Sequence, residues 1–142
     1  FLNEINVCKK KGDIHKNKWN GLGGKLEPLE SPEECARREV LEESGLSLNS
    51  VKFSGHLFFP EFDKEGNDWS VFVFTSDNFT GELIENPPEG ELHWIPKKDI
   101  LGLNLWEGDK YFLPLVLSDS TFLGKFKYMN GKLVDFSLNS NE

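Results

Sequence analysis

The chain has 142 residues, a length typical of one domain, and its 37% apolar and 28% charged residues are ordinary for a globular protein. Its formal net charge of −8 argues against a protein that binds a nucleic-acid backbone, which requires a basic surface. No apolar run is long enough to span a membrane and no signal peptide is visible, so we expect a cytoplasmic protein without a membrane anchor.

The two cysteines indicate the cellular compartment, and the first residue indicates where the domain begins. Cys8 and Cys35 lack the spacing of metal ligands, which is typical of reduced thiols in a cytosolic protein. The chain opens on Phe1 rather than on Met. We therefore expect one domain over residues 1–142 that lacks some N-terminal residues.

The N-terminal segments predict a strand, a loop and a turn. Residues Ile5–Lys10 can form a short strand, and the polar segment Lys11–Asn20 is interpreted as a loop. The segment Trp19–Gly24 is dense in glycine, which predicts a turn where the backbone can approach a ligand or another part of the chain.

The next segment predicts a helix with defined ends. Ser31 is a suitable N-cap, Pro32 suits the first helical position, and Glu34 completes a capping box. Gly45 is a natural stop. The helix is expected over Pro32–Glu43.

The second half of the chain alternates strands with one more helix. An Asn-Gly pair at residues 130–131 predicts a tight hairpin turn. Strands are expected at residues 51–59, 69–75 and 92–95. Two more strands are expected on either side of this turn, and the second of them covers residues 133–138. A helix is expected at residues 108–117. This order of elements predicts an α+β fold with a mixed sheet.

Three acidic side chains share one face of the first helix. Glu39, Glu42 and Glu43 are spaced i, i+3 and i+4, which places them within an arc of about 100°. They repel one another, and they lie in the last turn, where the helix dipole disfavours negative charge. Bound divalent cations would remove this conflict because Mg²⁺ prefers oxygen ligands. The alternative is a solvated acidic face, screened by Arg37 and Arg38.

The surrounding spacing decides between these interpretations. Five residues separate Gly24 from Glu30, and seven residues separate Glu30 from Arg38-Glu39-Val40. Glu42-Glu43 and then Gly45-Leu46 follow, each after a gap of one residue. This segment resembles the signature of the Nudix hydrolase family, with every defining position filled.

The resemblance implies a fold and a site. The fold is a mixed sheet sandwiched between helices, with the signature as a loop–helix–loop. Glu39, Glu42 and Glu43 would bind Mg²⁺, with Mn²⁺ as a substitute, and the carbonyl of Gly23 or Gly24 would add a ligand. Arg38 would hold the acidic helix through an ion pair with Glu30 or Glu43.

The same resemblance implies the chemistry. Water attacks a phosphorus of a diphosphate linkage, cations neutralise charge on the phosphoryl oxygens, and a carboxylate takes the proton. Glu42 or Glu43 is a candidate base. Glu89, five residues before Trp94, matches a family position for a further carboxylate that is a metal ligand or base. Its alternative is a plain loop acid.

Residues outside the signature indicate the substrate. Trp19-Asn20-Gly21 before the Gly-Gly pair and the segment from Trp106 to Tyr111 resemble the MutT-type oxidised-purine triphosphatases. In that group Asn20 and Asp109 would read the purine, Trp106 would stack on it, and Lys10 would contact phosphate or sugar. Vertebrate members have two consecutive Asp here, and Gly108 stands in the place of the first.

Each of these residues has a structural alternative. Asn20 would serve only a turn, Trp106 only the core, Asp109 only as the N-cap of a helix, and Lys10 only as a solvated lysine.

Three functions follow from these patterns. The first is Mg²⁺-dependent hydrolysis of 8-oxo-dGTP, or a related oxidised purine triphosphate, to the monophosphate and pyrophosphate. The second is a Nudix enzyme for ADP-ribose, a dinucleoside polyphosphate or a nucleotide sugar. The third is a binding module without catalysis, which would not need its three intact Glu. The expected partner is a small nucleotide rather than nucleic acid or membrane, and the protein is a monomer or a homodimer.

Overall fold

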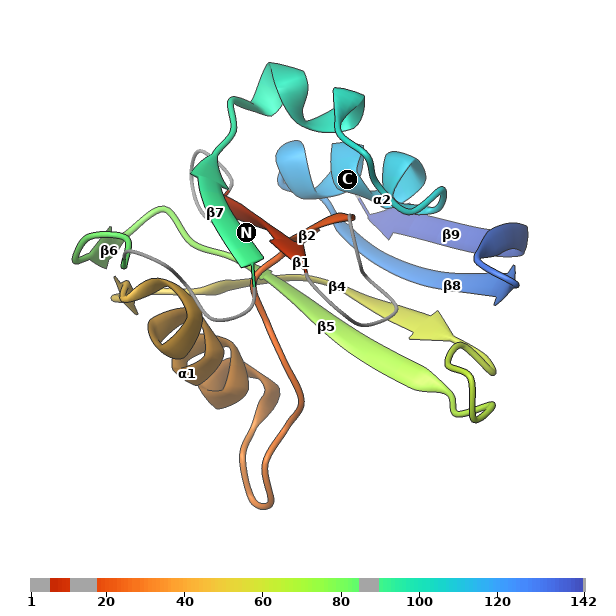
Figure 1. Cartoon of the computed structure of the whole chain (residues 1–142), viewed down its shortest axis with the longest axis horizontal. Helices are drawn as coiled ribbons and strands as arrows, with labels where there is room; N and C mark the ends of the chain where they lie inside the picture. Colours follow the sequence, from red (N-terminus) through yellow and green to blue (C-terminus); the bar gives the residue numbers. More distant parts are fainter. Residues whose placement is uncertain (1–5, 11–17, 85–89, 142) are drawn as a thin grey trace. The chain divides into compact units, whose positions relative to one another are not determined.

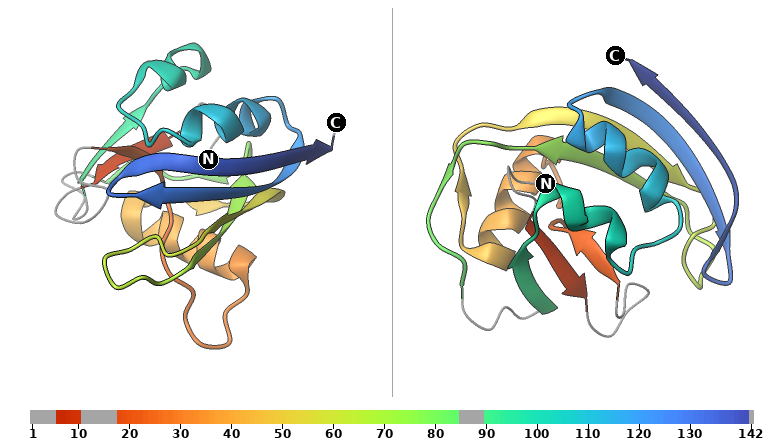
Figure 2. Two further views of the ribbon diagram at one scale, coloured as in Figure 1. Left: turned by 90° about the vertical axis from the view of Figure 1, so that its right-hand side faces the viewer. Right: turned by 90° about the horizontal axis from the view of Figure 1, so that it is seen from above.

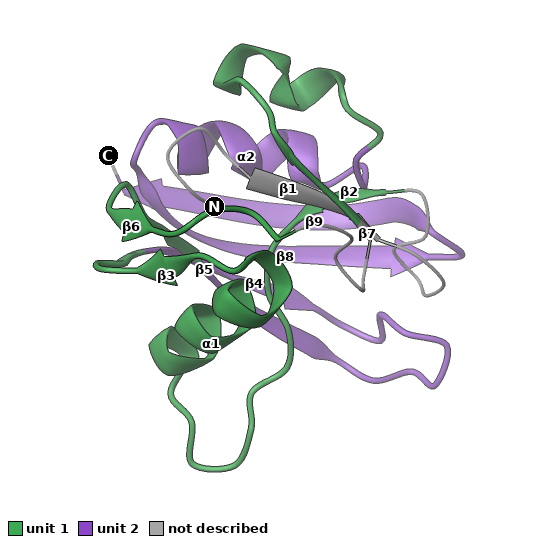
Figure 3. Ribbon diagram, turned by 60° about the vertical axis from the view of Figure 1, so that its left-hand side comes forward, with its two compact units in different colours: residues 1–52, 74–104 green, residues 53–73, 105–142 purple. Residues whose placement is uncertain are grey.

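The computed structural model describes residues 6–10, 18–84 and 90–141, with side chains for all of these except residues 6–10 and 90 (Figure 1). The chain groups into two compact units, residues 1–52 with 74–104 and residues 53–73 with 105–142 (Figure 3). We call them unit 1 and unit 2. A single domain over residues 1–142 stays a prediction.

Unit 1 holds two small sheets and helix α1. The sheet of three antiparallel strands has the order β2-β1-β7. Its strands are β1 (Asn6–Lys10), β2 (Trp19–Gly21) and β7 (Gly90–Trp94). A second antiparallel pair joins β3 (Ser47–Leu48) to β6 (Phe79–Thr80), and a 3₁₀ helix, η1, covers Lys97–Gly102.

Helix α1 (Pro32–Ser44) begins and ends as local capping residues dictate. The Ser31 hydroxyl accepts a hydrogen bond from the Glu34 amide, and the Glu34 carboxylate accepts one from the Ser31 amide. Gly45 adopts a left-handed conformation, with φ at 83°, and its amide donates to the Leu41 carbonyl at 2.9 Å. Val40 and Leu46 form the buried core beside this helix.

Unit 2 is built on a four-stranded mixed sheet and helix α2. The strand order is β5-β4-β8-β9, in which β4 and β8 are parallel and β8 and β9 antiparallel. The strands are β4 (Lys52–Phe59), β5 (Trp69–Thr75), β8 (Thr121–Met129) and β9 (Lys132–Asn141). Helix α2 (Asp109–Leu117) packs on β8 and β9 (Figure 2). The predicted mixed sheet is confirmed.

The β8–β9 hairpin turns where the sequence predicts it. Asn130 and Gly131 both have positive φ, at 53° and 78°, which is the conformation required by a two-residue turn matched to the twist of the strands. The return strand runs from Lys132 to Asn141, longer than the predicted segment 133–138, because pairing with β8 continues to its first residue.

The core of unit 2 is aromatic. Phe112, Phe122, Phe126 and Tyr128 are all buried, and Phe126 is fully so. Phe126 contacts the rings of Phe112 and Phe136, with centroids 6.0 Å and 5.4 Å away. Such contacts add to the stabilisation from apolar burial.

One sequence-based assignment is wrong in part. The predicted loop Lys11–Asn20 ends early, because Trp19 and Asn20 lie in strand β2 and pair with Lys9 and Cys8. The Trp19 amide also donates to the carbonyl of Asn104 at 3.0 Å. Three residues are too few to show a periodicity, and their partners are distant in the sequence. Residues 11–17 lie outside the described residues.

Candidate functional site

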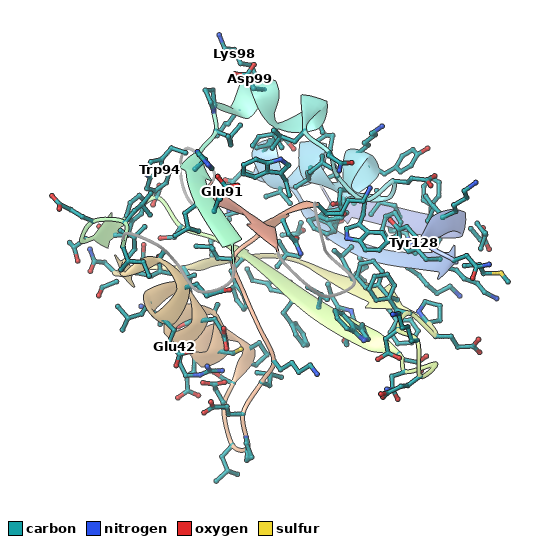
Figure 4. The ribbon with its side chains drawn as sticks, viewed as in Figure 1. Glu42, Glu91, Trp94, Lys98, Asp99 and Tyr128 are labelled. Carbon is teal, nitrogen blue, oxygen red and sulfur yellow. The ribbon has the colours of Figure 1, made fainter. Side chains whose placement is uncertain are left out.

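The acidic face of α1 presents three carboxylates in different environments. The Glu43 residue is only 5% exposed, and the side chain of Glu39 is 15% exposed. The side chain of Glu42, which is labelled on α1 in Figure 4, is 57% exposed. The three carboxylates predicted from the spacing thus differ in their access to water.

The turn predicted over Trp19–Gly24 is wrong in its first half, which forms strand β2, and the two glycines that follow, Gly23 and Gly24, approach two of these carboxylates. The Gly23 amide donates a hydrogen bond of 2.8 Å to Glu43 Oε1. The Glu39 carboxyl group lies against Gly24 so closely that a Cβ at Gly24 would be 2.6 Å from its Oε1. A side chain at position 24 would therefore displace Glu39. The requirement for glycine here is steric, as expected where backbone approaches a site closely.

Arg38 ties the loop before α1 to the helix. Its guanidinium donates to both oxygens of Glu30, at 2.6 and 2.9 Å, and to the Lys25 carbonyl at 3.1 Å. The predicted ion pair with Glu30 is confirmed. Bidentate pairs of this kind are strong and fix geometry.

The Arg38 guanidinium also contacts the acidic face itself. It donates to Glu39 Oε1 at 2.7 Å and to Glu42 Oε2 at 3.2 Å. Its hydrogen bonds, together with the Glu27 backbone, hold the pKa of Glu30 at about 2, and the acidic neighbours raise the pKa of Arg38. Arg38 therefore stays charged, and it offsets part of the repulsion between the carboxylates.

The donors fit a hard divalent cation. Glu39, Glu42 and Glu43 supply carboxylate oxygens from one helix face, where the Gly23 amide binds Glu43 and the backbone of Gly24 lies against Glu39. In the part of the chain that the structure describes, no three acidic, His or Cys side chains are yet arranged around one point.

The predicted base-contacting residues fall in both units. Asn20 lies in β2 of unit 1, on the same sheet face as Leu92, and its Oδ1 accepts from the Gly21 amide at 2.9 Å. Trp106 and Asp109 lie in unit 2, Trp106 three residues before Asp109, which is the first residue of α2. Glu89 lies outside the described residues, and so does the side chain of Lys10, whose backbone belongs to β1.

Two aromatic residues beside Trp106 were missed by sequence analysis. The Trp106 ring lies 5.5 Å from Phe62 and 5.3 Å from Tyr128, measured between centroids. Phe62 belongs to the hairpin between β4 and β5, and Tyr128 to β8. Both residues are far from Trp106 in the sequence, so no local pattern predicts that the three rings lie together.

Comparisons with known proteins identify the family of the chain. The acidic face of α1, contacted by Arg38 and by the Gly23 amide, carries carboxylate oxygens of the kind that hard divalent cations bind. A family model described as the NUDIX domain matches residues 3–116, and the chain belongs to the Nudix family. It is accordingly a Nudix hydrolase, and enzymes of this family act on small nucleotides and generally use a divalent metal.

Curated relatives share most of the chain. A zebrafish (Danio rerio) protein called oxidized purine nucleoside triphosphate hydrolase is 37% identical over 88% of this chain and 79% of its own length. A mouse (Mus musculus) protein of the same name is 36% identical over 85% of this chain and 76% of its own length.

A solved structure supports the fold. The MutT protein from Bacillus halodurans aligns with a TM-score of 0.86 at 30% identity, over 98% of this chain and 92% of its own. The predicted α+β Nudix fold is confirmed. Neither α-helix in the described residues is long and apolar enough to cross a membrane.

Proposed function

We propose that this enzyme hydrolyses oxidised purine nucleoside triphosphates, with 8-oxo-dGTP as the main substrate, to the monophosphate and pyrophosphate. The observation that carries the proposal is the acidic face of α1, closed by Gly23 and Gly24 and held by Arg38. The names of the zebrafish and mouse relatives support the choice of substrate. The role is then the removal of oxidised nucleotides from the nucleotide pool.

We assign the metal site to Glu39, Glu42 and Glu43, with Gly23 and Gly24 adding backbone oxygens. When bound there, Mg²⁺, or Mn²⁺ in its place, would supply positive charge for the phosphoryl oxygens and would make the attacking water more acidic. Arg38 positions the acidic helix through Glu30 and is not itself a proton carrier, because its guanidinium remains charged.

Among the described carboxylates, Glu42 is the best placed to accept the proton of the attacking water. Its side chain is 57% exposed although Arg38 donates to one of its oxygens, whereas Glu43 is buried and accepts a hydrogen bond from Gly23. A general base must be within reach of the water that it deprotonates. Glu89 retains its proposed role as a further ligand or base.

The base is recognised by Asn20, Asp109 and Trp106, and Lys10 contacts phosphate or sugar. Because Asn20 Oδ1 accepts from its neighbour Gly21, the Nδ2 group remains to donate to acceptors on the purine edge. Trp106 stacks on the base, and the Asp109 carboxylate accepts from its N–H groups.

We further propose that the enzyme acts in the cytoplasm as a monomer or homodimer. The net charge of −8 supports small nucleotides rather than nucleic acid as its substrates. The cation then supplies the local positive charge that a triphosphate requires.

The test is product analysis with Mg²⁺ and separate samples of 8-oxo-dGTP, dGTP, dATP, ADP-ribose and a dinucleoside tetraphosphate. We expect 8-oxo-dGTP to give the monophosphate and pyrophosphate fastest. Glu42→Gln should lower kcat by about a hundredfold or more. Glu33→Gln, a surface change in the first turn of the same helix, is the control and should keep normal rates.

Two results would contradict the proposal. Faster turnover of ADP-ribose or the dinucleotide would leave the proposed metal site on α1 unchanged, but it would contradict the proposed substrate. Binding of nucleotide without release of any phosphate product would indicate a binding module.

A further inference from the structure

Gly108 lies between the two residues of unit 2 that we assign to the base, and a distant tyrosine binds it. Its amide donates a 2.6 Å hydrogen bond to the Tyr128 hydroxyl oxygen, which comes from strand β8 (Figure 4). Both residues are buried, and Tyr128 is 6% exposed. A buried amide has a strong requirement for such a partner.

Tyr128 contacts the turn from Trp106 to Asp109 at a second point. Its ring meets the Trp106 ring edge-on, at 5.3 Å and an interplanar angle of 78°. The turn is closed by a hydrogen bond of 3.0 Å from the Asp109 amide to the Trp106 carbonyl. One side chain therefore touches both the aromatic ring and the backbone of the turn.

The hydroxyl of Tyr128 also accounts for the glycine. A Cβ at Gly108 would lie 2.6 Å from the Tyr128 hydroxyl oxygen and 2.7 Å from Cδ1 of the fully buried Phe126. The φ of Gly108 is −70°, which any residue adopts, so the exclusion of a side chain is steric rather than conformational. A carboxylate at this position and the present hydroxyl are incompatible.

The hydroxyl is a neutral group in a negative environment. Burial is the main cause that raises the pKa of Tyr128, and the carboxylates of Asp109 and Glu107 raise it further, while the Gly108 amide lowers it. The Asp109 carboxylate therefore helps to keep protonated the same hydroxyl that binds the Gly108 amide.

We propose that Tyr128 is a positioning residue for base recognition. Its hydroxyl fixes the turn from Trp106 to Asp109, so that ring and carboxylate are presented together to the purine. Glycine at position 108 leaves room for this hydroxyl and for the Phe126 ring, and we assign the adjacent Asp109 carboxylate to the base. The inference rests on the proposed function, which assigns Trp106 and Asp109 to the base.

The test compares Tyr128→Phe with Tyr111→Phe in the full chain. Tyr111 is the other tyrosine of the sequence, is 49% exposed, and stacks on Phe136 at 4.3 Å. For Tyr128→Phe we expect KM for 8-oxo-dGTP to rise about five- to tenfold with kcat within about twofold, since one hydrogen bond that orients the turn is lost. The preference for 8-oxo-dGTP over dGTP should fall as well. Tyr111→Phe should match the unmodified enzyme.

A second measurement does not depend on activity. In the unmodified protein the Gly108 amide should be protected from hydrogen exchange, and its NMR resonance should move upfield in Tyr128→Phe but not in Tyr111→Phe. A freely exchanging Gly108 amide in the unmodified protein would overturn the proposal even where a variant fails to fold.

The outcomes separate this inference from the proposed function. If the enzyme prefers 8-oxo-dGTP and the two tyrosine variants have equal KM values, only the positioning role is overturned. A fall in kcat at unchanged KM would also overturn it. An enzyme that hydrolyses no purine triphosphate would remove the proposed function and this inference together.

Discussion

At the scale of single residues, the adjacent glycines Gly23 and Gly24 differ in what they require. A Cβ at Gly23 would meet nothing within 4 Å, whereas one at Gly24 would overlap the Glu39 carboxyl group. Gly23 contributes through its amide, which binds Glu43 at 2.8 Å. Position 24 therefore accepts a side chain only if the Glu39 carboxyl group moves, and position 23 supplies a backbone donor.

This difference predicts unequal effects of alanine. Gly24→Ala should displace Glu39 and raise the Mg²⁺ concentration for half-maximal activity by about tenfold, the cost typical of disturbed metal surroundings. Gly23→Ala keeps the amide and should have a smaller effect. A Mg²⁺ titration of the rate measures both, and equal effects would contradict the close approach as its cause.

The residues that the sequence predicts correctly have partners nearby in the chain or a diagnostic spacing. The ion pair of Arg38 with Glu30 and the carboxylates of α1 lie within one short segment. Tyr128 was missed because its bond to Gly108 joins residues 20 positions apart and depends on how β8 and α2 pack. No local pattern carries that information.

At the scale of elements, α1 and the loop before it form one piece held by Arg38. The helix was predictable because its caps are local: Ser31 and Glu34 at one end and Gly45 at the other. Strand β2 was not, because its three residues take their partners from β1 and from Asn104. Short strands defined by distant pairing leave little periodicity in the sequence.

The ion pair of Glu30 predicts a specific dependence of stability on pH. The pKa of Glu30 falls from an ordinary 4.5 to about 2 because Arg38 binds the charged form. The stabilisation is therefore complete above pH 4.5 and is lost as the pH falls through about 2. The difference in Tm between the unmodified protein and Glu30→Gln should narrow over this range.

Thermal unfolding from neutral pH to about pH 2 measures this difference. The control is Glu33→Gln, which removes an exposed pair with Arg37 at 3.4 Å and should change Tm little throughout. If the difference in Tm between the unmodified protein and Glu30→Gln stays constant across the pH range, the ion pair does not stabilise the loop.

At the scale of the whole molecule, the chain has an acidic helix face in unit 1 and an aromatic cluster in unit 2. The Nudix fold follows from the signature, which identifies the family, and from the matching family model and solved structure. The division into two compact units could not be predicted, because it arises from contacts between segments far apart in the sequence.

Metal binding should stabilise the folded chain as a whole. If Mg²⁺ binds only the folded state, a concentration of one hundred times its Kd adds about 2.7 kcal/mol to the free energy of unfolding. EDTA should abolish this gain, and Glu43→Gln should reduce it, whereas Glu33→Gln should retain it. Calorimetry measures the change, and a gain equal in all variants would place the cation elsewhere.

The central claim is the preference for an oxidised purine, and a competition assay tests it most directly. Equal amounts of 8-oxo-dGTP and dGTP are offered to the enzyme with Mg²⁺, and the two monophosphates are quantified while little substrate is consumed. The ratio of products gives the ratio of kcat/KM values, and we predict at least about tenfold in favour of 8-oxo-dGTP. A ratio near one, or one that favours dGTP, would contradict the account of the substrate.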